Sequence, residues 1–138
     1  SGKINLSIEE LAARVKQQDT TYNKKYPTLL IFQGKKDLIV DYKNAYEIVK
    51  QWTALHNCDT IADKTYENYK NIEGLTRYDY YNWENTAVVK LYLMDKLGHT
   101  LMIKPGKAED EGGKTGLFGV NKNFHSTYYV AKEFGLVR

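Results

Sequence analysis

The chain has 138 residues, of which 42% are apolar and 27% charged, and its formal net charge is +3. This length and composition predict one globular domain over residues 1–138 and exclude wholesale disorder. Lysines alternate with acidic residues, so no nucleic-acid partner is expected, and no apolar stretch approaches the ~20 residues of a membrane span. The only cysteine, Cys58, excludes a disulfide within the chain.

The first predicted element is a helix over about residues 8–17. Ser7, followed three residues later by Glu10, forms a capping-box pattern, in which each side chain bonds the backbone N–H of the other residue. Apolar residues recur after it at helical spacing, so one face of the segment is apolar. Ser1-Gly2 resembles a cleavage scar, and the sequence shows no signal peptide.

The segment 28–42 combines a buried-strand pattern with an acid. Leu29 to Phe32 is an unbroken apolar run, typical of a strand covered on both faces of a parallel sheet. The run ends at Gly34, where the chain can turn, and Asp37 follows three residues later. Ligands and catalytic groups of open α/β sheets lie beyond the carboxyl ends of the strands, so Asp37 is a candidate site residue.

A helix and a less regular region follow. Asp41 is placed to cap a helix in which apolar residues recur at three- and four-residue steps as far as Leu55. Residues 59–86 mix tyrosines with polar residues and predict a hairpin, or a strand with an excursion.

The segment Ala87 to Leu93 predicts a second strand. It ends near Asp95, and the pair Gly98-His99 lies just beyond. Two strands therefore each deliver a polar group at the carboxyl end, an acid at Asp37 and a base at His99.

The C-terminal part begins with a glycine-rich loop, residues 104–119, that carries an acidic cluster. A loop of this length is either the rim or lid of a site or an idle surface loop. Asn121 or Asn123 is then placed to cap a last helix, which ends at Gly135 as a C-terminal glycine signal.

Together these elements predict an α/β fold with a mostly parallel sheet flanked by helices. The sequence predicts no metal site, because no set of His, Cys, Asp and Glu has the spacing of metal ligands. It predicts no nucleotide cofactor either, because no glycine-rich loop follows a strand and opens a helix with phosphate-binding spacing.

An acid followed by a histidine fits part of a Ser-His-Asp triad. In such a triad the carboxylate orients the imidazole and stabilises the imidazolium, and the imidazole takes the proton of the nucleophile. The order along an α/β-hydrolase chain is nucleophile, acid, base. Asp37 and His99 match the last two places.

The same residues resemble a known family, the α/β-hydrolase esterases of the polyhydroxybutyrate depolymerase and feruloyl esterase type. The resemblance rests on Gly34-x-x-Asp37-x-x-Val40, Tyr42, Ala45, Trp52 and Gly98-His99. It implies a serine esterase in which His99 is the general base and then the general acid, and Asp37 is the orienting carboxylate. It covers only the C-terminal half of such an enzyme, and it favours a secreted or periplasmic location.

The chain departs from this family at several positions. Gln33 stands where many relatives carry a histidine, and Thr100-Leu101-Met102 replaces a Trp-Pro-Gly-Gly-like turn. No serine lies in a Gly-x-Ser-x-Gly elbow, because Ser7 caps a helix and Ser126 falls within the last one. We therefore expect a chain that is inactive alone, that acts on an ester substrate only with the missing N-terminal half, and that dimerises through an exposed sheet edge.

Other interpretations are open at this point. Asp37 could serve only as an Asx-turn residue, and Asp41 is a rival acid, although a helix-cap role accounts for it better. His56 and His125 are expected to be structural. The alternative function is a non-catalytic binding or interaction module whose tyrosine-rich segment, residues 66–83, presents an aromatic face to a polysaccharide or a protein.

Overall fold

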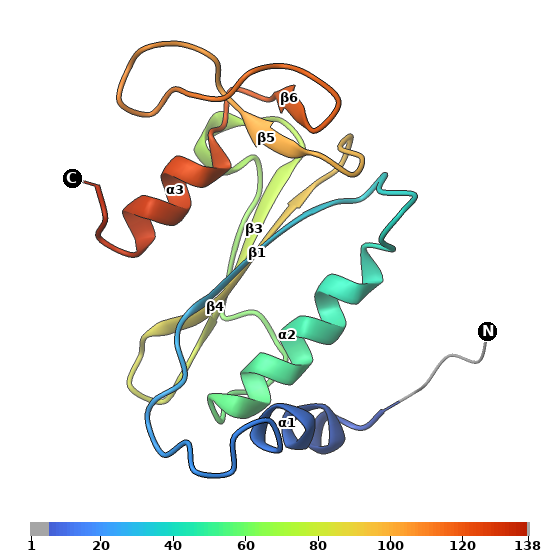
Figure 1. Cartoon of the computed structure of the whole chain (residues 1–138), viewed down its shortest axis with the longest axis vertical. Helices are drawn as coiled ribbons and strands as arrows, with labels where there is room; N and C mark the ends of the chain where they lie inside the picture. Colours follow the sequence, from blue (N-terminus) through green and yellow to red (C-terminus); the bar gives the residue numbers. More distant parts are fainter. Residues whose placement is uncertain (1–5, 138) are drawn as a thin grey trace. The chain divides into compact units, whose positions relative to one another are not determined.

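The computed structural model describes residues 6–137 (Figure 1). These residues divide into two compact units. The first unit contains the chain up to Ile31 together with the segments Lys43–Thr65 and Tyr78–Leu91. The second unit contains Phe32–Tyr42, Tyr66–Arg77 and the chain from Tyr92 onward. The expectation of a single domain over residues 1–138 stays a prediction.

Two helices belong to the first unit, α1 (Ile8–Lys16) and α2 (Lys43–Leu55). The predicted capping box of α1 is present: the Ser7 hydroxyl accepts the Glu10 amide at 3.2 Å, and the Glu10 carboxylate accepts the Ser7 amide at 2.7 Å. The two helices contact each other, and the side-chain amide of Gln51 donates to the Leu11 carbonyl oxygen at 2.8 Å.

Four strands form the main sheet in the order β1-β4-β3-β2. They are β1 (Leu29–Gly34), β2 (Lys64–Tyr66), β3 (Leu75–Tyr81) and β4 (Ala87–Met94). A short 3-10 helix, η1 (Tyr69–Asn71), lies between β2 and β3. The predicted strand over Ala87 to Leu93 is present as β4, and its residues after Ala87 are all buried, including Lys90.

The sheet is mixed, which corrects the prediction of a mostly parallel one. The Lys35 amide donates to the Met94 carbonyl oxygen at 2.9 Å, so the carboxyl ends of β1 and β4 are neighbours and the two strands are parallel. The Asp95 amide donates to the Gly74 carbonyl oxygen at 3.0 Å, which brings the start of β3 to the end of β4. These two strands are antiparallel, and their short connection allows only a hairpin.

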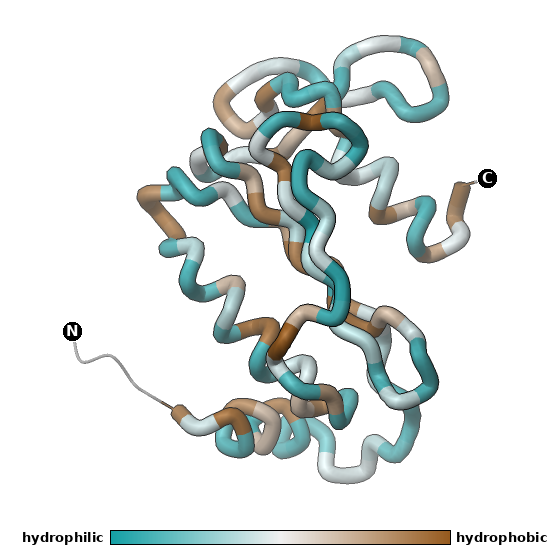
Figure 2. The backbone as a smooth tube through the Cα atoms, turned by 180° about the vertical axis from the view of Figure 1, so that it is seen from behind, coloured by the Kyte–Doolittle hydropathy of each residue, from teal (hydrophilic) through white to brown (hydrophobic). Residues whose placement is uncertain are grey.

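The second unit also contains two strands that the sequence did not predict. β5 (Leu101–Ile103) and β6 (Gly119–Asn121) pair in parallel on either side of the glycine-rich loop. A salt bridge connects two residues of that loop, since the Lys104 amine lies 2.7 Å from the Asp110 carboxylate. The coloured tube shows hydrophobic stretches along the strands and both hydrophilic and hydrophobic stretches in the loops (Figure 2).

The last helix, α3 (Ser126–Glu133), contacts β5 and begins later than predicted. His125 is its N-cap, whereas the Asn121 side chain accepts the Asn123 amide in the preceding turn. The predicted glycine signal is present: Gly135 has φ +67°, and the amides after Phe134 bond back to the Ala131 and Lys132 carbonyl oxygens.

Aromatic rings fill the core of the second unit. Phe32 of β1 stacks on Tyr92 of β4 at a centroid distance of 4.4 Å, and Phe124 stacks on Tyr129 of α3 at 4.3 Å. The Arg77 guanidinium packs on the rings of Tyr66, Tyr69 and Tyr92. These contacts fix the carboxyl ends of β1 and β4, from which the candidate site extends.

Candidate functional site

Two loops of the second unit meet beyond the ends of β1 and β4. Asp37 lies three residues after β1, and His99 lies in the loop between β4 and β5. The Lys36 amide donates to the Leu97 carbonyl oxygen at 2.9 Å, which joins the loops directly. The two loops can come this close because Gly34 has no side chain. A Cβ at this position would clash with the Leu97 carbonyl oxygen and would lie 2.7 Å from the Gly98 carbonyl oxygen.

Asp37 organises its own loop. One carboxylate oxygen accepts the Ile39 amide at 2.9 Å and the Val40 amide at 2.8 Å. The other accepts the side-chain amide of Gln33 at 3.2 Å. The Asx-turn role considered from the sequence is therefore real, and it holds the carboxylate rigidly in place.

The same second oxygen of Asp37 lies 2.9 Å from Nδ1 of His99. The predicted proximity of this acid and this imidazole is confirmed, whereas their catalytic role stays a prediction. Because the carboxylate can only accept, Nδ1 must carry the proton, which leaves Nε2 of the neutral ring as an acceptor. The Asp37 side chain is 6% exposed and that of His99 is 45% exposed, so the imidazole is the accessible member of the pair.

Hydrogen bonding lowers the pKa of the Asp37 carboxyl from 3.8 to about 2. The largest cause is the bond from the Val40 amide, and the bonds from His99, Ile39 and Gln33 act in the same direction, against the opposing effect of burial. Asp37 is thus an anion at neutral pH, as an orienting carboxylate must be.

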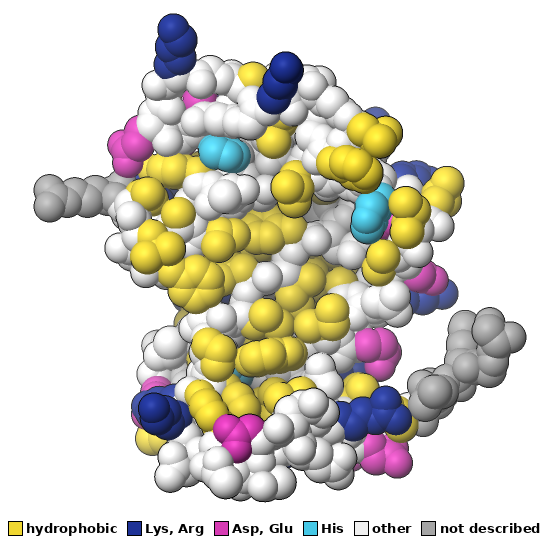
Figure 3. All heavy atoms as spheres, viewed as in Figure 1, with side chains coloured by type: hydrophobic (Ala, Val, Ile, Leu, Met, Phe, Trp, Pro, Cys, Tyr) yellow, Lys and Arg dark blue, Asp and Glu magenta, His cyan; other side chains and the backbone are white. Residues whose placement is uncertain are grey.

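The pair borders a pocket of about 260 Å³ in the second unit. Besides the pair, its lining is largely apolar or neutral and consists of Phe32, Gln33, Gly34, Val40, Gly98, Thr100, Leu101 and Phe118. Two of its large apolar side chains are exposed, Leu101 by 56% and Phe118 by 63%. The space-filling view shows apolar side chains (yellow) exposed over much of one face of the molecule (Figure 3). An open apolar rim beside a polar pair is typical of a binding surface.

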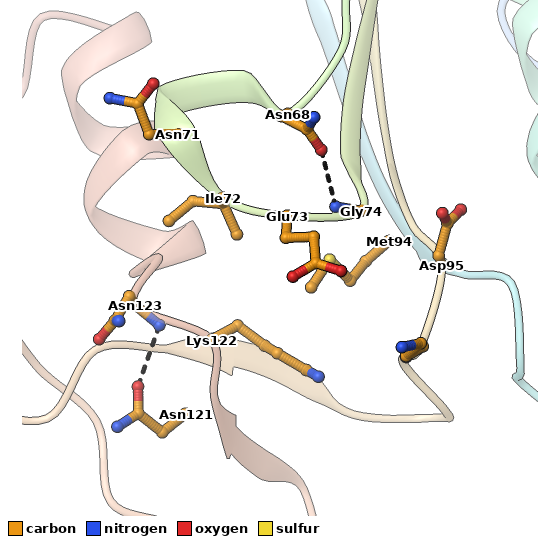
Figure 4. Close-up of a pocket in the computed structure, with 11 residues that line it drawn as sticks. Asn68, Asn71, Ile72, Glu73, Gly74, Met94, Asp95, Asn121, Lys122 and Asn123 are labelled. Carbon is orange, nitrogen blue, oxygen red and sulfur yellow. Dashed lines mark hydrogen bonds between the residues drawn. The ribbon is translucent and has the colours of Figure 1, made fainter.

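A second hollow of about 570 Å³ in the same unit is polar (Figure 4). Its asparagines have backbone roles: Asn68 accepts the Gly74 amide and Asn121 accepts the Asn123 amide, each at 3.0 Å. Asn68, Asn71 and Asn123 also have positive φ values, a conformation that asparagine tolerates well. Turn geometry therefore accounts for these side chains.

Some residues of the site were not predicted from the sequence. Gln33, noted only as a departure from the family, bonds Asp37 and also the carbonyl oxygens of Gly34 and Val40. Phe118 belongs to the glycine-rich loop. Its carbonyl oxygen accepts the Leu101 amide at 3.0 Å, and this bond holds Phe118 beside Leu101 at the pocket. Asp41, the rival acid, is not among the residues that line the pocket.

The other candidates have structural surroundings. His56 Nε2 lies 3.1 Å from the Pro27 carbonyl oxygen, and burial lowers the pKa of this histidine. Burial and neighbouring acids raise the pKa of the Cys58 thiol, which disfavours a thiolate. The buried Ser126 hydroxyl donates to the Met102 carbonyl oxygen at 3.0 Å, and Ser7 caps α1.

The described part of the chain meets the requirements of neither a metal-binding cluster nor a membrane-spanning helix. Among residues 6–137, no group of three His, Cys, Asp or Glu side chains is placed to hold a metal ion. None of the helices in this range has the length and apolar character needed to cross a bilayer.

The tyrosines of residues 66–83 are partly structural. Tyr80 is 3% exposed, and burial raises its pKa to about 12. Tyr69 packs on Arg77 and accepts a hydrogen bond from it at 2.8 Å. These contacts do not favour the alternative in which the segment presents an aromatic face, although Trp83 and Tyr66 are exposed.

Comparison with known proteins points to ester hydrolases. The chain is 28% identical over 116 residues to poly(3-hydroxyalkanoate) depolymerase C of Paucimonas lemoignei, a match that covers 84% of this chain and 27% of the depolymerase. It is 30% identical over 101 residues to an acetylxylan esterase of Coprinopsis cinerea, covering 73% of this chain and 26% of that protein. The chain is related to carboxylic ester hydrolases. No protein-family model matches it.

A solved esterase structure supports the predicted α/β fold. The acetyl xylan esterase from Aspergillus awamori aligns with 70% of this chain at a TM-score of 0.60 and 21% identity, covering 33% of the esterase. The chain spans about a quarter of the length of the two relatives and a third of this structure. The α/β expectation is thus supported at the level of an esterase fold.

Proposed function

We propose that this chain is the C-terminal portion of a serine esterase of the α/β-hydrolase class and supplies the acid and the base of a Ser-His-Asp triad. The observation that carries the proposal is the 2.9 Å contact between Asp37 and Nδ1 of His99 at the carboxyl ends of two parallel strands. The acid precedes the base along the chain, which is the α/β-hydrolase order. Similarity to a depolymerase and to acetylxylan esterases supports ester hydrolysis as the reaction.

In the proposed reaction, Nε2 of His99 takes the proton of a serine hydroxyl while that oxygen attacks the ester carbonyl carbon. The bond between the acyl carbon and the alkoxy oxygen then breaks, and the proton passes to the leaving alcohol. A water molecule, deprotonated by the same nitrogen, then attacks the acyl carbon. The bond between that carbon and the serine oxygen breaks, the proton passes from Nε2 to the serine oxygen, and the acid leaves. Asp37 stays ionised throughout and stabilises the imidazolium.

The proposal places the nucleophile and the oxyanion hole in an N-terminal half that this sequence does not include. Ser7 and Ser126 are engaged in a helix cap and in a buried hydrogen bond, so neither is offered to His99. The isolated chain is therefore proposed to be inactive. A secreted or periplasmic location, favoured by the family resemblance, belongs to the same proposal.

The test begins with the parent gene upstream of Ser1, where we expect a Gly-x-Ser-x-Gly motif between a strand and a helix pattern. The polypeptide that includes this motif should hydrolyse a p-nitrophenyl ester, whereas residues 1–138 alone should not. In that polypeptide His99→Ala should abolish the activity and His125→Ala should preserve it. Activity of the isolated chain that depends on His99, or full activity of the longer His99→Ala variant, would contradict the proposal.

A further inference from the structure

The pocket beside His99 has a wall of apolar side chains that no hydrogen-bonding requirement of the loops accounts for. Its apolar side chains are those of Phe32, which stacks on Tyr92, and of Val40, Leu101 and Phe118. The titratable groups of the lining, Asp37 and His99, are paired with each other. A ligand that enters this pocket therefore meets one accessible imidazole and otherwise neutral, mostly apolar atoms.

The backbone holds this wall in place from two directions. On one side, the amides of Ile39 and Val40 both donate to the Asp37 carboxylate, which fixes the loop with Leu38 and Ile39 exposed. On the other side, the Leu101 amide donates to the Phe118 carbonyl oxygen at the start of the β5–β6 pair. The wall is thus built from residues whose backbones are held by hydrogen bonds, with the side chains of Leu101 and Phe118 exposed and that of Val40 half-buried.

We infer that Leu101, Phe118 and Val40 form an acyl-binding wall that makes this site prefer esters of apolar acyl groups longer than acetyl. The inference rests on the proposed function, since it assigns the pocket to the ester held against His99. The neutral, apolar lining complements an alkyl chain and offers few partners for the hydroxyl groups of a sugar. A volume of about 260 Å³ suits a short acyl chain.

The inference is tested by binding, so that it does not depend on a nucleophile. The full chain is titrated with methyl acetate, with methyl butyrate and with a soluble acetylated xylo-oligosaccharide while the amide and methyl NMR signals are followed. Each buried methylene improves binding about fourfold, and methyl butyrate has two more of them, so it should bind about fifteenfold more tightly than methyl acetate. The shifted signals should be those of Val40, Leu101 and Phe118.

Two variants of neighbouring residues complete the experiment. Phe118→Ala removes a wall side chain and should weaken methyl butyrate binding by about fivefold or more. Leu117→Ala removes an equally apolar side chain of the same loop that does not line the pocket, and it should leave the affinity unchanged. Both side chains are largely exposed, so neither truncation is expected to unfold the chain.

Several outcomes would overturn the inference. These are equal affinities for the two methyl esters, absence of saturable binding, tighter binding of the acetylated sugar, or equal losses in Phe118→Ala and Leu117→Ala. None of them bears on the triad itself, which is tested by hydrolysis in the longer polypeptide. Failure of the acyl wall and failure of the proposed esterase function are therefore distinguishable.

Discussion

Asp37 serves two purposes that the sequence presented as alternatives. One of its carboxylate oxygens closes an Asx-type turn through the Ile39 and Val40 amides, and the other faces His99. The turn immobilises the carboxylate, and a fixed carboxylate orients an imidazole better than a mobile one. The structural role of Asp37 is thus what makes its proposed catalytic role possible.

The low pKa of Asp37 leads to a pH prediction. Its pKa is about 2 in the folded chain and 3.8 without these contacts, so the unfolded state binds more protons between these values. The stabilisation by Asp37 is complete above about pH 4 and is lost as the pH falls through 2. The carboxyl carbon signal of Asp37 should titrate with a midpoint near 2, and a midpoint near 3.8 would contradict this.

The tautomer of His99 provides a second prediction. In Asp37→Asn, the remaining oxygen can accept the Ile39 and Val40 amides, while the new NH₂ group faces Nδ1 of His99. Nδ1 must then accept, so we expect the proton to move to Nε2, the nitrogen that a base needs free. Long-range ¹⁵N NMR of the imidazole should show this exchange of tautomers.

The control for that experiment is Asp41→Asn. Asp41 was the rival acid in the sequence, and it does not line the pocket. The tautomer of His99 should be the same in this variant as in the native chain. A change of tautomer in Asp41→Asn, or none in Asp37→Asn, would remove Asp37 from its proposed orienting role.

At the scale of the element, the junction of the two loops depends on the missing side chain of Gly34. In Gly34→Ala the new methyl group would meet backbone carbonyl oxygens of Leu97 and Gly98, which cannot rotate away. We expect a loss of about 1–3 kcal/mol in the free energy of unfolding, as for other overpacked sites. Urea denaturation measures this loss, and the NMR contact between Asp37 and His99 should weaken with it.

Gly98→Ala is the matched control for Gly34→Ala. A Cβ at Gly98 would lie 3.8 Å from its nearest neighbour, the Lys36 carbonyl oxygen, which is ordinary contact. The free energy of unfolding should therefore change by less than about 0.5 kcal/mol. Equal effects of the two substitutions would show that the loop junction is not the constraint.

Local signals explain which elements could be predicted from the sequence. The capping box of α1, the apolar run of β1 and the glycine at the end of α3 act within a few residues, and all three are present. β5 and β6 are three residues each and pair across the whole glycine-rich loop, so neither has a periodic pattern. Gln33 reaches Asp37 only after the loop has folded, which no linear spacing shows.

The candidate site also combines features that local sequence signals predict with features that depend on non-local contacts. The convergence of Asp37 and His99 could be predicted because parallel neighbouring strands end at the same edge of a sheet. The orientation of β3 could not be derived from its apolar pattern, and the sheet is consequently mixed. Phe118 enters the pocket through non-local strand pairing, so its place was not visible in the sequence.

The main sheet of the described chain has two edge strands of different character, β2 and β1. β2 is a three-residue strand that carries Lys64 and is exposed along its length, which are features of a protected edge. β1, at the other edge, has six residues and no charged side chain. Its outer backbone groups form a template on which a further strand can pair.

The edge of β1 leads to the last prediction, that the isolated chain associates with itself through this strand. Leu30→Lys places a charge on the edge and should shift the population towards monomer in sedimentation velocity, because charged edges oppose strand pairing. Leu136→Lys introduces the same charge at an exposed residue after α3 and should leave the association unchanged. A monomer at every concentration, or equal effects of the two lysines, would contradict association through β1. In a longer polypeptide that supplies a neighbouring strand, the association should be absent, because the same edge would already be paired.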